Sequence, residues 1–257
     1  MASLINEKVV EIHHWNESLF SFKTTRSQSF TFENGHFVMM GLMVDNKPLL
    51  RAYSIASPNY ADYLEFFSIK VPNGPLTSKL QYVKPGDEVV ISTKPTGTLV
   101  ADNLLPGKRL YLLSTGTGLA PFMSIIRDPE IYDKYEHIVL THGVRALSDL
   151  AYQHFIINDL PKTPYFGELI QEKLKYFPTV TREAYVNQGR LTEWLESGKL
   201  AEQLDLPSPS IEEDRFMLCG GPSMLKSLGE ILQNAGFVES RHGKQAHYVI
   251  ERAFVEK

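Results

Sequence analysis

Two glycines separated by one residue follow an apolar segment near the middle of the chain, in the stretch STGTGLAP at residues 114–121. If a strand precedes them and a helix follows, Gly116 and Gly118 lie at a strand-to-helix turn, where free backbone N–H groups favour an anion. Glycine also lets a pyrophosphate approach the backbone closely, and Pro121 suits a first helical turn. The alternative is a tight turn that binds nothing, because the third glycine of the usual dinucleotide fingerprint is missing.

A second stretch, RFMLCGGPSML at residues 215–225, repeats this layout of apolar strand, small residues, proline and helix. In an open parallel sheet, two such turns meet at the crevice where the strand order reverses. That crevice is the size of site that a dinucleotide needs. The second turn therefore favours a dinucleotide site over a bare turn.

Arginines stand where such a site would select its nucleotide. Enzymes that prefer NAD place a carboxylate about 20 residues past the glycines, whereas NADP calls for arginine. Here THGVR puts Arg145 at this place, and Arg182 and Arg190 follow other strand or helix boundaries. A guanidinium pairs with phosphate through two bonds, and each charge-assisted bond contributes about 1.5–3 kcal/mol. Together the three arginines predict an NADP preference, although any one of them alone would be read as a solvated surface residue.

A third candidate lies in the first half of the chain, in LLRAYSIASP at residues 49–58. Strand alternation puts Arg51 and Tyr53 on one face and Ser54 on the other. Arginine can neutralise a pyrophosphate, tyrosine can cover an aromatic ring, and serine can donate a hydrogen bond to a ring nitrogen. The stretch GPLTS at residues 74–78 begins a short helix, whose free N-terminal N–H groups are suited to bind a phosphate. The alternative is a barrel strand with its tyrosine in the core and its arginine on the surface.

Two different frameworks are expected to position these residues. The first half holds short β-like runs separated by turn signals: EKVVEIHHW, SLFSFKTT, HFVMMGLMV, LLRAYSIA, YLEFFSIKV and DEVVIST. These runs, with one helical patch at 76–82, predict a small antiparallel six-stranded β-barrel. From residue 109 onward, apolar strands alternate with helical segments at 121–127, 149–159, 191–195 and 224–235. This alternation predicts a Rossmann-like α/β domain whose parallel sheet is covered on both faces.

The domain boundary is expected in the turn-rich stretch 94–108, which gives domains of 1–100 and 101–257. A chain of 257 residues with 43% hydrophobic and 22% charged residues has room for two such units. The longest apolar run, 38–44, is far shorter than the about 20 residues that span a bilayer. The first residues lack the apolar core of a signal peptide, so a cytoplasmic protein without a membrane partner is expected.

Charge and cysteine content exclude some function classes. The net charge is −4 with no long basic block, so nucleic acid is not an expected partner. A single cysteine, Cys219, excludes an internal disulfide and a four-cysteine iron–sulfur cluster, and no metal site is expected. Any redox chemistry must come from a bound organic cofactor. Cys219 itself is either a small buried apolar residue or, given its place before Gly220, part of the site.

Five motifs occur in a fixed order along nearly the whole chain: RAYS at 51–54, GPLTSKL at 74–80, STGTGLAPF at 114–122, HGVR at 142–145 and CGGPSM at 219–224. In this order and at this spacing they resemble the ferredoxin–NADP(H) reductase family. The closing AFVEK resembles the bacterial members that use ferredoxin or flavodoxin. The resemblance implies an FAD-dependent enzyme that exchanges a hydride with NADP(H) and single electrons with ferredoxin or flavodoxin, usually running from NADPH to the carrier. We expect it to be a monomer.

The resemblance also implies which residues form the site. It makes Ser54, near the flavin N5, a candidate catalytic residue together with Tyr53, Cys219 beside the nicotinamide, and Ala253. Residues implied to hold FAD are Arg51, Ala52, Tyr53, Ser54, Phe67, Ser68, Ile69, Lys70, Val71, Gly74, Leu76, Thr77 and Phe254. Residues implied to hold NADP(H) are Thr115, Gly116, Thr117, Gly118, Arg145, Arg182, Arg190, Gly220, Gly221, Pro222 and Met224.

The end of the chain departs from part of the family. Plant-type members end in an aromatic residue that stacks on the flavin, but this chain continues through residues 253–257. The bacterial resemblance suggests Ala253 near the isoalloxazine and Phe254 against the adenine. A small residue in place of an aromatic lid puts any transfer of plant turnover behaviour in doubt.

Two other functions fit parts of the sequence. One is an NAD(P)H:flavin reductase or the reductase component of an oxygenase, against which the three arginines and the extended tail argue. The other is a dinucleotide-binding module without enzymatic activity, which would not bind a flavin.

Overall fold

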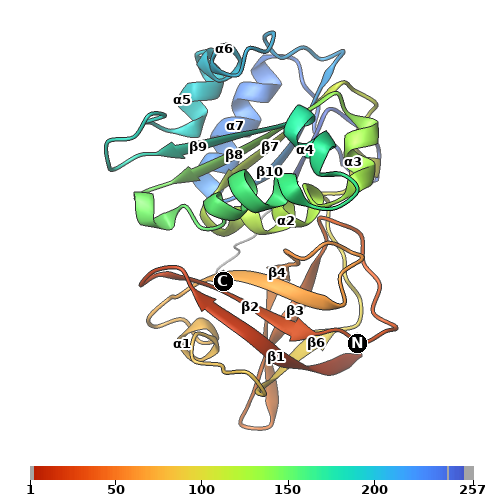
Figure 1. The fold of residues 1–257 in the computed structure, drawn as a ribbon, viewed down its shortest axis with the longest axis vertical. Helices are drawn as coiled ribbons and strands as arrows, with labels where there is room; N and C mark the ends of the chain where they lie inside the picture. Colours follow the sequence, from red (N-terminus) through yellow and green to blue (C-terminus); the bar gives the residue numbers. More distant parts are fainter. Residues whose placement is uncertain (1–2, 242, 252–257) are drawn as a thin grey trace.

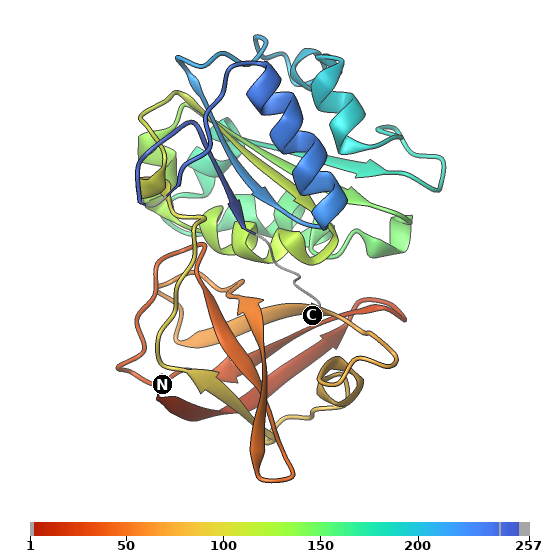
Figure 2. The same cartoon turned by 180° about the vertical axis from the view of Figure 1, so that it is seen from behind.

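The computed structural model describes residues 3–241 and 243–251 and consists of two lobes. A β-barrel lobe forms the lower half and an α/β lobe the upper half, with the connecting chain along one side (Figure 1). Figure 2 shows the same two lobes from behind, where helix α7 (Pro222–Asn234) runs across the outer face of the upper sheet.

The lower lobe is a six-stranded antiparallel sheet in the order β4-β3-β6-β1-β2-β5. Its strands are β1 (Leu4–His14), β2 (Leu19–Thr25), β3 (Phe37–Val44), β4 (Lys47–Ser54), β5 (Tyr63–Ile69) and β6 (Glu88–Ser92), and its helix is α1 (Thr77–Leu80). A bridge between Ile55 and Phe66 joins the end of β4 to β5, so the two outer strands approach each other at one corner. The predicted antiparallel barrel fold is confirmed as a half-barrel.

Alternation of apolar and polar side chains explains why these segments form a barrel. Phe20 and Phe22 of β2 and Leu64 and Phe66 of β5 are buried in one cluster that fills the barrel, as expected when every second residue of a strand points inward. The β3–β4 hairpin turns through Asp45 and Asn46, which both have positive φ values of 49° and 60°. Such a two-residue turn matches the twist of the paired strands.

The upper lobe is a five-stranded parallel sheet in the order β11-β10-β7-β8-β9. Its strands are β7 (Arg109–Thr115), β8 (His137–Val144), β9 (Leu174–Val180), β10 (Asp214–Cys219) and β11 (Tyr248–Glu251). The chain starts in the middle of the sheet at β7, proceeds outward through β8 and β9, and returns on the other side at β10. The strand order therefore reverses between β7 and β10, which confirms the predicted α/β fold class with a switch point at the two glycine turns.

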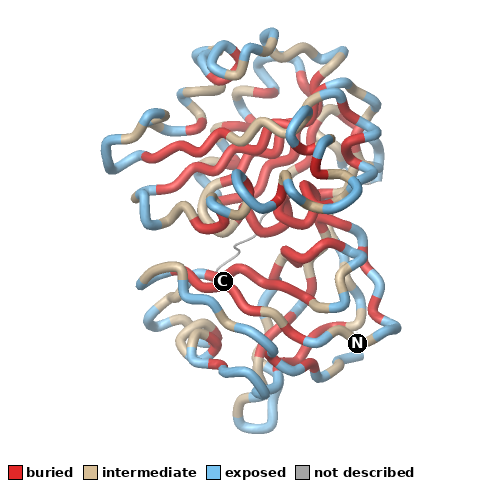
Figure 3. The backbone as a smooth tube through the Cα atoms, in the orientation of Figure 1, coloured by how far each residue is buried: buried red, intermediate tan, exposed pale blue. Residues whose placement is uncertain are grey.

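Helices cover both faces of this sheet. They are α2 (Leu119–Ile125), α3 (Pro129–Lys134), α4 (Gly167–Lys173), α5 (Leu191–Glu196), α6 (Lys199–Gln203) and α7 (Pro222–Asn234). Leu110 and Leu112 of β7 pack with α2, α3 and α4 on one face, whereas Tyr111 and Leu113 pack with α5, α6 and α7 on the other. The strands are buried along most of their length (Figure 3), as parallel strands covered on both faces must be.

The helix predicted over 149–159 is confirmed only in part. Its first half is wrong, since a three-residue turn at Leu147–Asp149 precedes a break in the chain direction, whereas residues 153–159 are helical and include the π-helix Phe155–Asp159, followed by a three-residue turn at Leu160–Lys162. Tyr152 has a φ of +62°, a left-handed conformation that no α-helix continues through. The sequence patterns also missed α3, α4 and α6, which are five to seven residues long, so that periodicity is only a weak signal for each of them.

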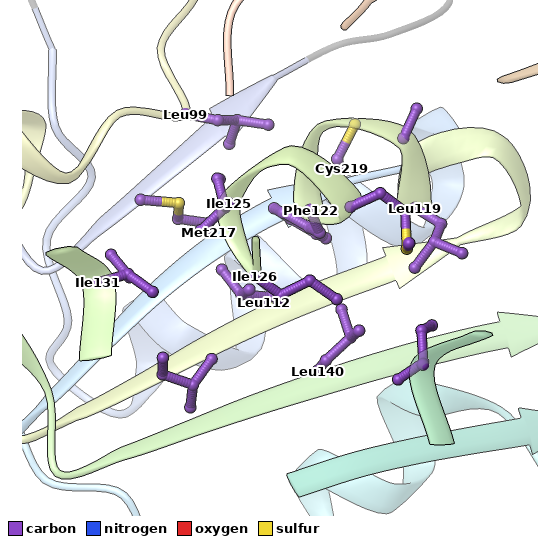
Figure 4. Close-up of a cluster of buried hydrophobic side chains, with 14 of the residues drawn as sticks. Leu99, Leu112, Leu119, Phe122, Ile125, Ile126, Ile131, Leu140, Met217 and Cys219 are labelled. Atoms are coloured by element: carbon purple, nitrogen blue, oxygen red, sulfur yellow. The ribbon is translucent and has the colours of Figure 1, made fainter. Parts of the chain in front are cut away.

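Helix α2 connects the two lobes. It lies at the lower edge of the upper lobe, directly facing the barrel (Figure 1), and all seven of its residues are buried. The Ser124 hydroxyl donates a hydrogen bond of 2.8 Å to Oδ1 of Asn34 in the barrel. Its inner side joins the cluster of Leu99, Phe122, Ile125 and Met217 (Figure 4).

Candidate active site

The two glycine-rich turns contact each other at the carboxyl ends of β7 and β10. A Cβ on Gly118 would collide with the backbone carbonyl of Cys219, and a Cβ on Gly220 would collide with the side chains of Thr115 and Met224. These two glycines are therefore required by the packing of one turn against the other. Sequence reasoning, which considered only the approach of a ligand, missed this role.

The other two glycines face open space. Gly116 has a φ of +53° and nothing within 4 Å of the position that a Cβ would take, and Gly221 is equally open. The backbone at these two positions is thus accessible to a bound group, which is the property that a pyrophosphate seat needs. Pro222, the first residue of α7, follows directly, and Thr117 is half-buried between the two glycines of the first turn.

The three predicted arginines line one cavity. Arg145, Arg182 and Arg190 surround a volume of about 500 Å³ together with Thr181, Gly189 and Glu193. All three arginines are exposed, and none takes part in a salt bridge within the described residues. A backbone hydrogen bond of 2.9 Å from Arg182 N–H to the Arg145 carbonyl joins the two segments. The cavity thus gathers three arginines and one glutamate, an excess of positive charge, at the carboxyl edge of β8 and β9.

One carboxylate lies in the same cavity but is engaged elsewhere. Glu193 accepts a hydrogen bond of 3.2 Å from the backbone N–H of Arg190 and so caps the start of α5. Because its charge is directed to a helix N-terminus, it complements the helix dipole there.

On the barrel side, Tyr53 and Ser68 tie β4 to β5. Their hydroxyls share a buried hydrogen bond of 3.3 Å, and Tyr53 is 9% exposed. Arg51 and Ala52 are exposed on the edge strand, where the Arg51 guanidinium donates a 2.8 Å bond to the carbonyl of Leu50. Phe67 packs edge-on against Tyr152 of the upper lobe, with ring centroids 5.3 Å apart.

The loop that follows β5 is held by one threonine. The Thr77 hydroxyl accepts a hydrogen bond of 3.2 Å from Val71 N–H and lies 3.3 Å from the Val71 carbonyl. A Cβ on Gly74 would lie 2.6 Å from that same hydroxyl, so the loop can close only around glycine. Leu76 anchors it in the barrel core, while Ile69 is exposed and Lys70 half-buried. No side chain caps the start of α1.

A residue that sequence reasoning missed, Glu251, lies between the two lobes at the end of β11. It is 6% exposed, and its Oε2 accepts a hydrogen bond of 3.1 Å from Thr98 N–H in the connecting segment. Gly97 leaves the space for this carboxylate, because a Cβ there would approach Oε2 to 2.9 Å. Oε1 is buried without a hydrogen-bond partner among residues 3–241 and 243–251.

Glu251 connects the predicted residues of both lobes. Burial raises its pKa to about 7, and the hydrogen bond from Thr98 N–H together with the nearby Ser54 hydroxyl offsets part of that increase. Ser54 ends β4 of the barrel, and Cys219 ends β10 directly beside β11, in register with Glu251. A carboxyl group that titrates near neutral pH thus stands at the point where strand ends of the two lobes meet.

Cys219 is fully buried in the cluster that packs on α2, close to Leu119 and Phe122 (Figure 4). Burial raises its pKa well above the ordinary value, and the nearby Glu251 charge adds to the increase. The thiol therefore stays protonated at neutral pH and is no nucleophile. Of the sequence-predicted site residues, Ala253 and Phe254 lie outside the described residues.

The described residues also bear on other functions. None of their helices is both long and apolar enough to cross a bilayer. No group of three His, Cys, Asp or Glu side chains in that part of the chain could hold a metal ion.

Two family models divide the chain as the two lobes do. The model described as "Oxidoreductase FAD-binding domain" matches residues 5–100, and the one described as "Oxidoreductase NAD-binding domain" matches residues 112–229. The fold and the site therefore define an oxidoreductase that uses a flavin and a pyridine nucleotide.

Individual relatives narrow this class. The chain is 61% identical to the ferredoxin–NADP reductase of Azotobacter vinelandii over the full length of both chains. It is 46% identical to the flavodoxin/ferredoxin–NADP reductase of Rhodobacter capsulatus, over 97% of this chain and 93% of that one. A crystal structure of a ferredoxin NADP+ reductase from Neisseria gonorrhoeae with bound FAD and NADP superimposes with a TM-score of 0.90 at 28% identity, covering 99% of this chain and 100% of that one. The chain belongs to the ferredoxin–NADP reductase family, as its motifs predicted.

The residues present fit the cofactors of this family. Exposed Arg51 lies beside the Tyr53–Ser68 pair, and the buried Oε1 of Glu251 has no partner within the described part of the chain; together they provide charge, an aromatic ring and a polar atom for a flavin nucleotide. The arginine-lined cavity and the open backbone at Gly116 suit a phosphorylated dinucleotide.

Proposed function

We propose that this protein is an FAD-dependent enzyme that transfers electrons from NADPH to ferredoxin. The observation that carries the proposal is the meeting of Ser54, Cys219 and Glu251, which brings the end of a barrel strand to the ends of two strands of the dinucleotide-binding lobe. A nicotinamide and a flavin must meet at such a junction for hydride transfer, since the reacting atoms need to be about 3–3.5 Å apart.

The proposal divides the work between residues 1–100, which hold FAD, and residues 101–257, which hold NADP(H). Arg51 would neutralise the FAD pyrophosphate, Tyr53 would cover the flavin ring, and Ser54 would donate a hydrogen bond to the ring nitrogen that receives the hydride. Residues 67–71 and 74–77 would line the remainder of FAD. Residues 115–118 and 220–224 would contact the NADP(H) pyrophosphate and nicotinamide, and the arginine cavity would hold the 2′-phosphate.

When bound, FAD accepts two electrons as a hydride and releases them singly, which joins a hydride donor to a one-electron carrier. The protein's own contribution is orientation and proton handling. The Glu251 carboxyl, whose pKa is raised to about 7, can hold a proton near neutral pH beside the Ser54 hydroxyl. Cys219 keeps a small, uncharged thiol beside them, so nothing there competes for the proton.

The electron carrier, the oligomeric state and the cellular location of this protein are also part of the proposal. The Azotobacter and Rhodobacter relatives are named for ferredoxin and for flavodoxin/ferredoxin, which supports ferredoxin as the carrier and flavodoxin as a second one. We further propose a monomer that works in the cytoplasm, which sedimentation of the purified protein and cell fractionation test.

One assay decides between this function and its alternatives. Purified protein supplied with FAD should show a flavin absorption spectrum, bleach with NADPH and reduce ferredoxin under anaerobic conditions. Reduction of free flavin in preference to ferredoxin would favour a flavin reductase, and a colourless protein would contradict any flavin-dependent function.

Replacing Ser54 with alanine should keep FAD bound but slow its reduction by NADPH by about 10- to 100-fold, because a neutral hydrogen bond and its orientation of the ring are lost. Stopped-flow bleaching of the flavin measures this rate. Ser27→Ala, a half-buried serine that follows β2 in the same lobe, is the matched control. Wild-type reduction by the Ser54 variant would leave Ser54 as an ordinary strand residue.

A further inference from the structure

A buried arginine joins the upper lobe to the barrel. Arg127 follows α2 and is 8% exposed. Its Nε donates a hydrogen bond of 2.8 Å to the Met123 carbonyl in the last turn of that helix. Its Nη2 reaches into the barrel, where it donates to the carbonyl of Ala56 and, at 3.0 Å, to Oε2 of Glu65. One side chain thus holds the end of a helix and two barrel segments.

Glu65 completes the contact from the barrel side. It is 5% exposed, and its Oε1 accepts a 3.0 Å hydrogen bond from the hydroxyl of Tyr152, another residue of the upper lobe. Its backbone pairs with the same segment that Arg127 holds, because Ala56 N–H donates to the Glu65 carbonyl at 2.8 Å. Both carboxylate oxygens are therefore used across the boundary between the lobes, and the buried charges are paired.

This contact lies on a short path between the two halves of the site. Ala56 is two residues past Ser54, or about 7 Å along extended chain. At the other end, Arg127 follows the seven-residue helix α2, about 10 Å long, which begins directly after the turn of Gly116 to Gly118. Both connections are therefore short and ordered. A shift of Arg127 relative to Ala56 would move the strand end that carries Ser54 against the glycine turn.

We propose that Arg127 is a positioning residue for hydride transfer, an inference that rests on the proposed function. With Glu65 and Tyr152 it fixes the barrel strand that ends at Ser54 against the turns that end β7 and β10. Arginine suits this role because its rigid planar fork can serve a helix carbonyl, a strand carbonyl and a carboxylate at once. A misplacement of about 1 Å between reacting atoms can cost about 100-fold in rate.

The test compares two buried arginines. Arg109 is 6% exposed and donates to Asp214 at 2.7 and 2.8 Å. It lies at the start of β7, at the opposite edge of the sheet, with its carboxylate partners inside the same lobe. Arg127→Met and Arg109→Met therefore both remove a buried charged side chain, but only the first removes a contact between the lobes.

Stopped-flow reduction of the FAD-loaded variants by saturating NADPH gives the limiting rate. We expect Arg127→Met to lower this rate by about 10- to 100-fold and Arg109→Met to leave it within about twofold of wild type. FAD content and the rate of reduction by dithionite, which needs no nicotinamide geometry, should not change in either variant. The long-wavelength absorption of a nicotinamide stacked on the flavin should weaken in Arg127→Met only.

Tyr152→Phe provides a second test of the proposal if Arg127→Met does not fold. It removes one hydroxyl and keeps the ring that packs on Trp15 and Phe67 at centroid distances of 4.6 and 5.3 Å. We expect the limiting rate of this variant to fall by about threefold to tenfold with an unchanged midpoint for NADPH.

Three results would overturn the proposal: a wild-type limiting rate in both Arg127→Met and Tyr152→Phe, equal slowing in Arg127→Met and Arg109→Met, or a matching loss of dithionite reduction. Wild-type protein that binds FAD but is not reduced by NADPH would instead refute the proposed function, so the two failures are distinguishable.

Discussion

Replacing Arg145 or Arg190 with alanine should raise the KM for NADPH by about 10- to 150-fold while leaving turnover of NADH almost unchanged. The magnitude follows from the about 1.5–3 kcal/mol of a charge-assisted hydrogen bond to phosphate. The discrimination follows from chemistry, because NADH lacks the 2′-phosphate that these arginines would bind. Both side chains are exposed and line one cavity, so their removal leaves no buried group unpaired and should not affect folding.

Steady-state kinetics with both nucleotides measure the effect. Arg241→Ala is the matched control, because that arginine is also exposed but pairs with Glu239 at 2.6 Å, away from the cavity. Equal losses with NADPH and NADH would contradict the 2′-phosphate assignment. The double variant should lose more NADPH affinity than either single one, although two arginines that share one phosphate need not contribute additively.

The sequence predicted the fold well where one local rule decides the structure. The barrel strands follow from period-two alternation, for example the inward Phe20 and Phe22, and Asp45-Asn46 marks its hairpin by turn chemistry. The five parallel strands follow from apolar runs spaced by helical segments. The start of the helix predicted over 149–159 was mispredicted because the chain turns at a left-handed Tyr152, whose hydroxyl donates to Glu65 of the barrel. A contact with a residue 87 positions away leaves no periodic trace in the local sequence.

The site residues, too, were predicted only where the local sequence carries a recognisable pattern. Glycine pairs and arginines carry recognisable spacing, and the structure brings the three arginines together at one cavity. Glu251 was missed because a single carboxylate at the end of an apolar strand, YVIE, looks like an ordinary polar terminus. Its burial depends on Gly97 and Thr98, more than 150 residues earlier. The ion pair of Arg127 and Glu65 was missed for a similar reason. The two residues are 62 positions apart, and only the packing of the two lobes brings them together.

Replacing Glu251 with glutamine should change both the pH dependence of stability and the turnover with ferredoxin. In the folded protein the pKa of Glu251 is raised to about 7 from an ordinary value of 4.5. Between these two values the unfolded chain has lost its proton while the folded chain keeps it, so stability falls as the pH rises from about 4.5 to about 7 and then levels off. The loss amounts to about 3 kcal/mol, at 1.36 kcal/mol for each pKa unit.

Glutamine cannot ionise, so the substitution Glu251→Gln should remove this decline. We expect the variant and the wild type to be equally stable near pH 4.5, and the variant to be more stable by up to about 3 kcal/mol at pH 8. Denaturant unfolding of the FAD-loaded proteins at several pH values measures the difference. A decline of unchanged size in the variant would assign the titration to another group.

Turnover should respond in the opposite direction, because an amide cannot take up or release a proton beside the Ser54 hydroxyl. General acid–base groups contribute about 10²- to 10⁴-fold, so kcat with ferredoxin should fall by at least about 100-fold while the KM for NADPH changes little. The pH dependence of kcat near 7 should also disappear. Glu239→Gln, which alters a surface ion pair with Arg241, should leave both unchanged. A variant that is more stable at high pH yet less active would separate the two roles of the buried carboxyl: ionisation at this position lowers stability, and proton exchange there sustains turnover.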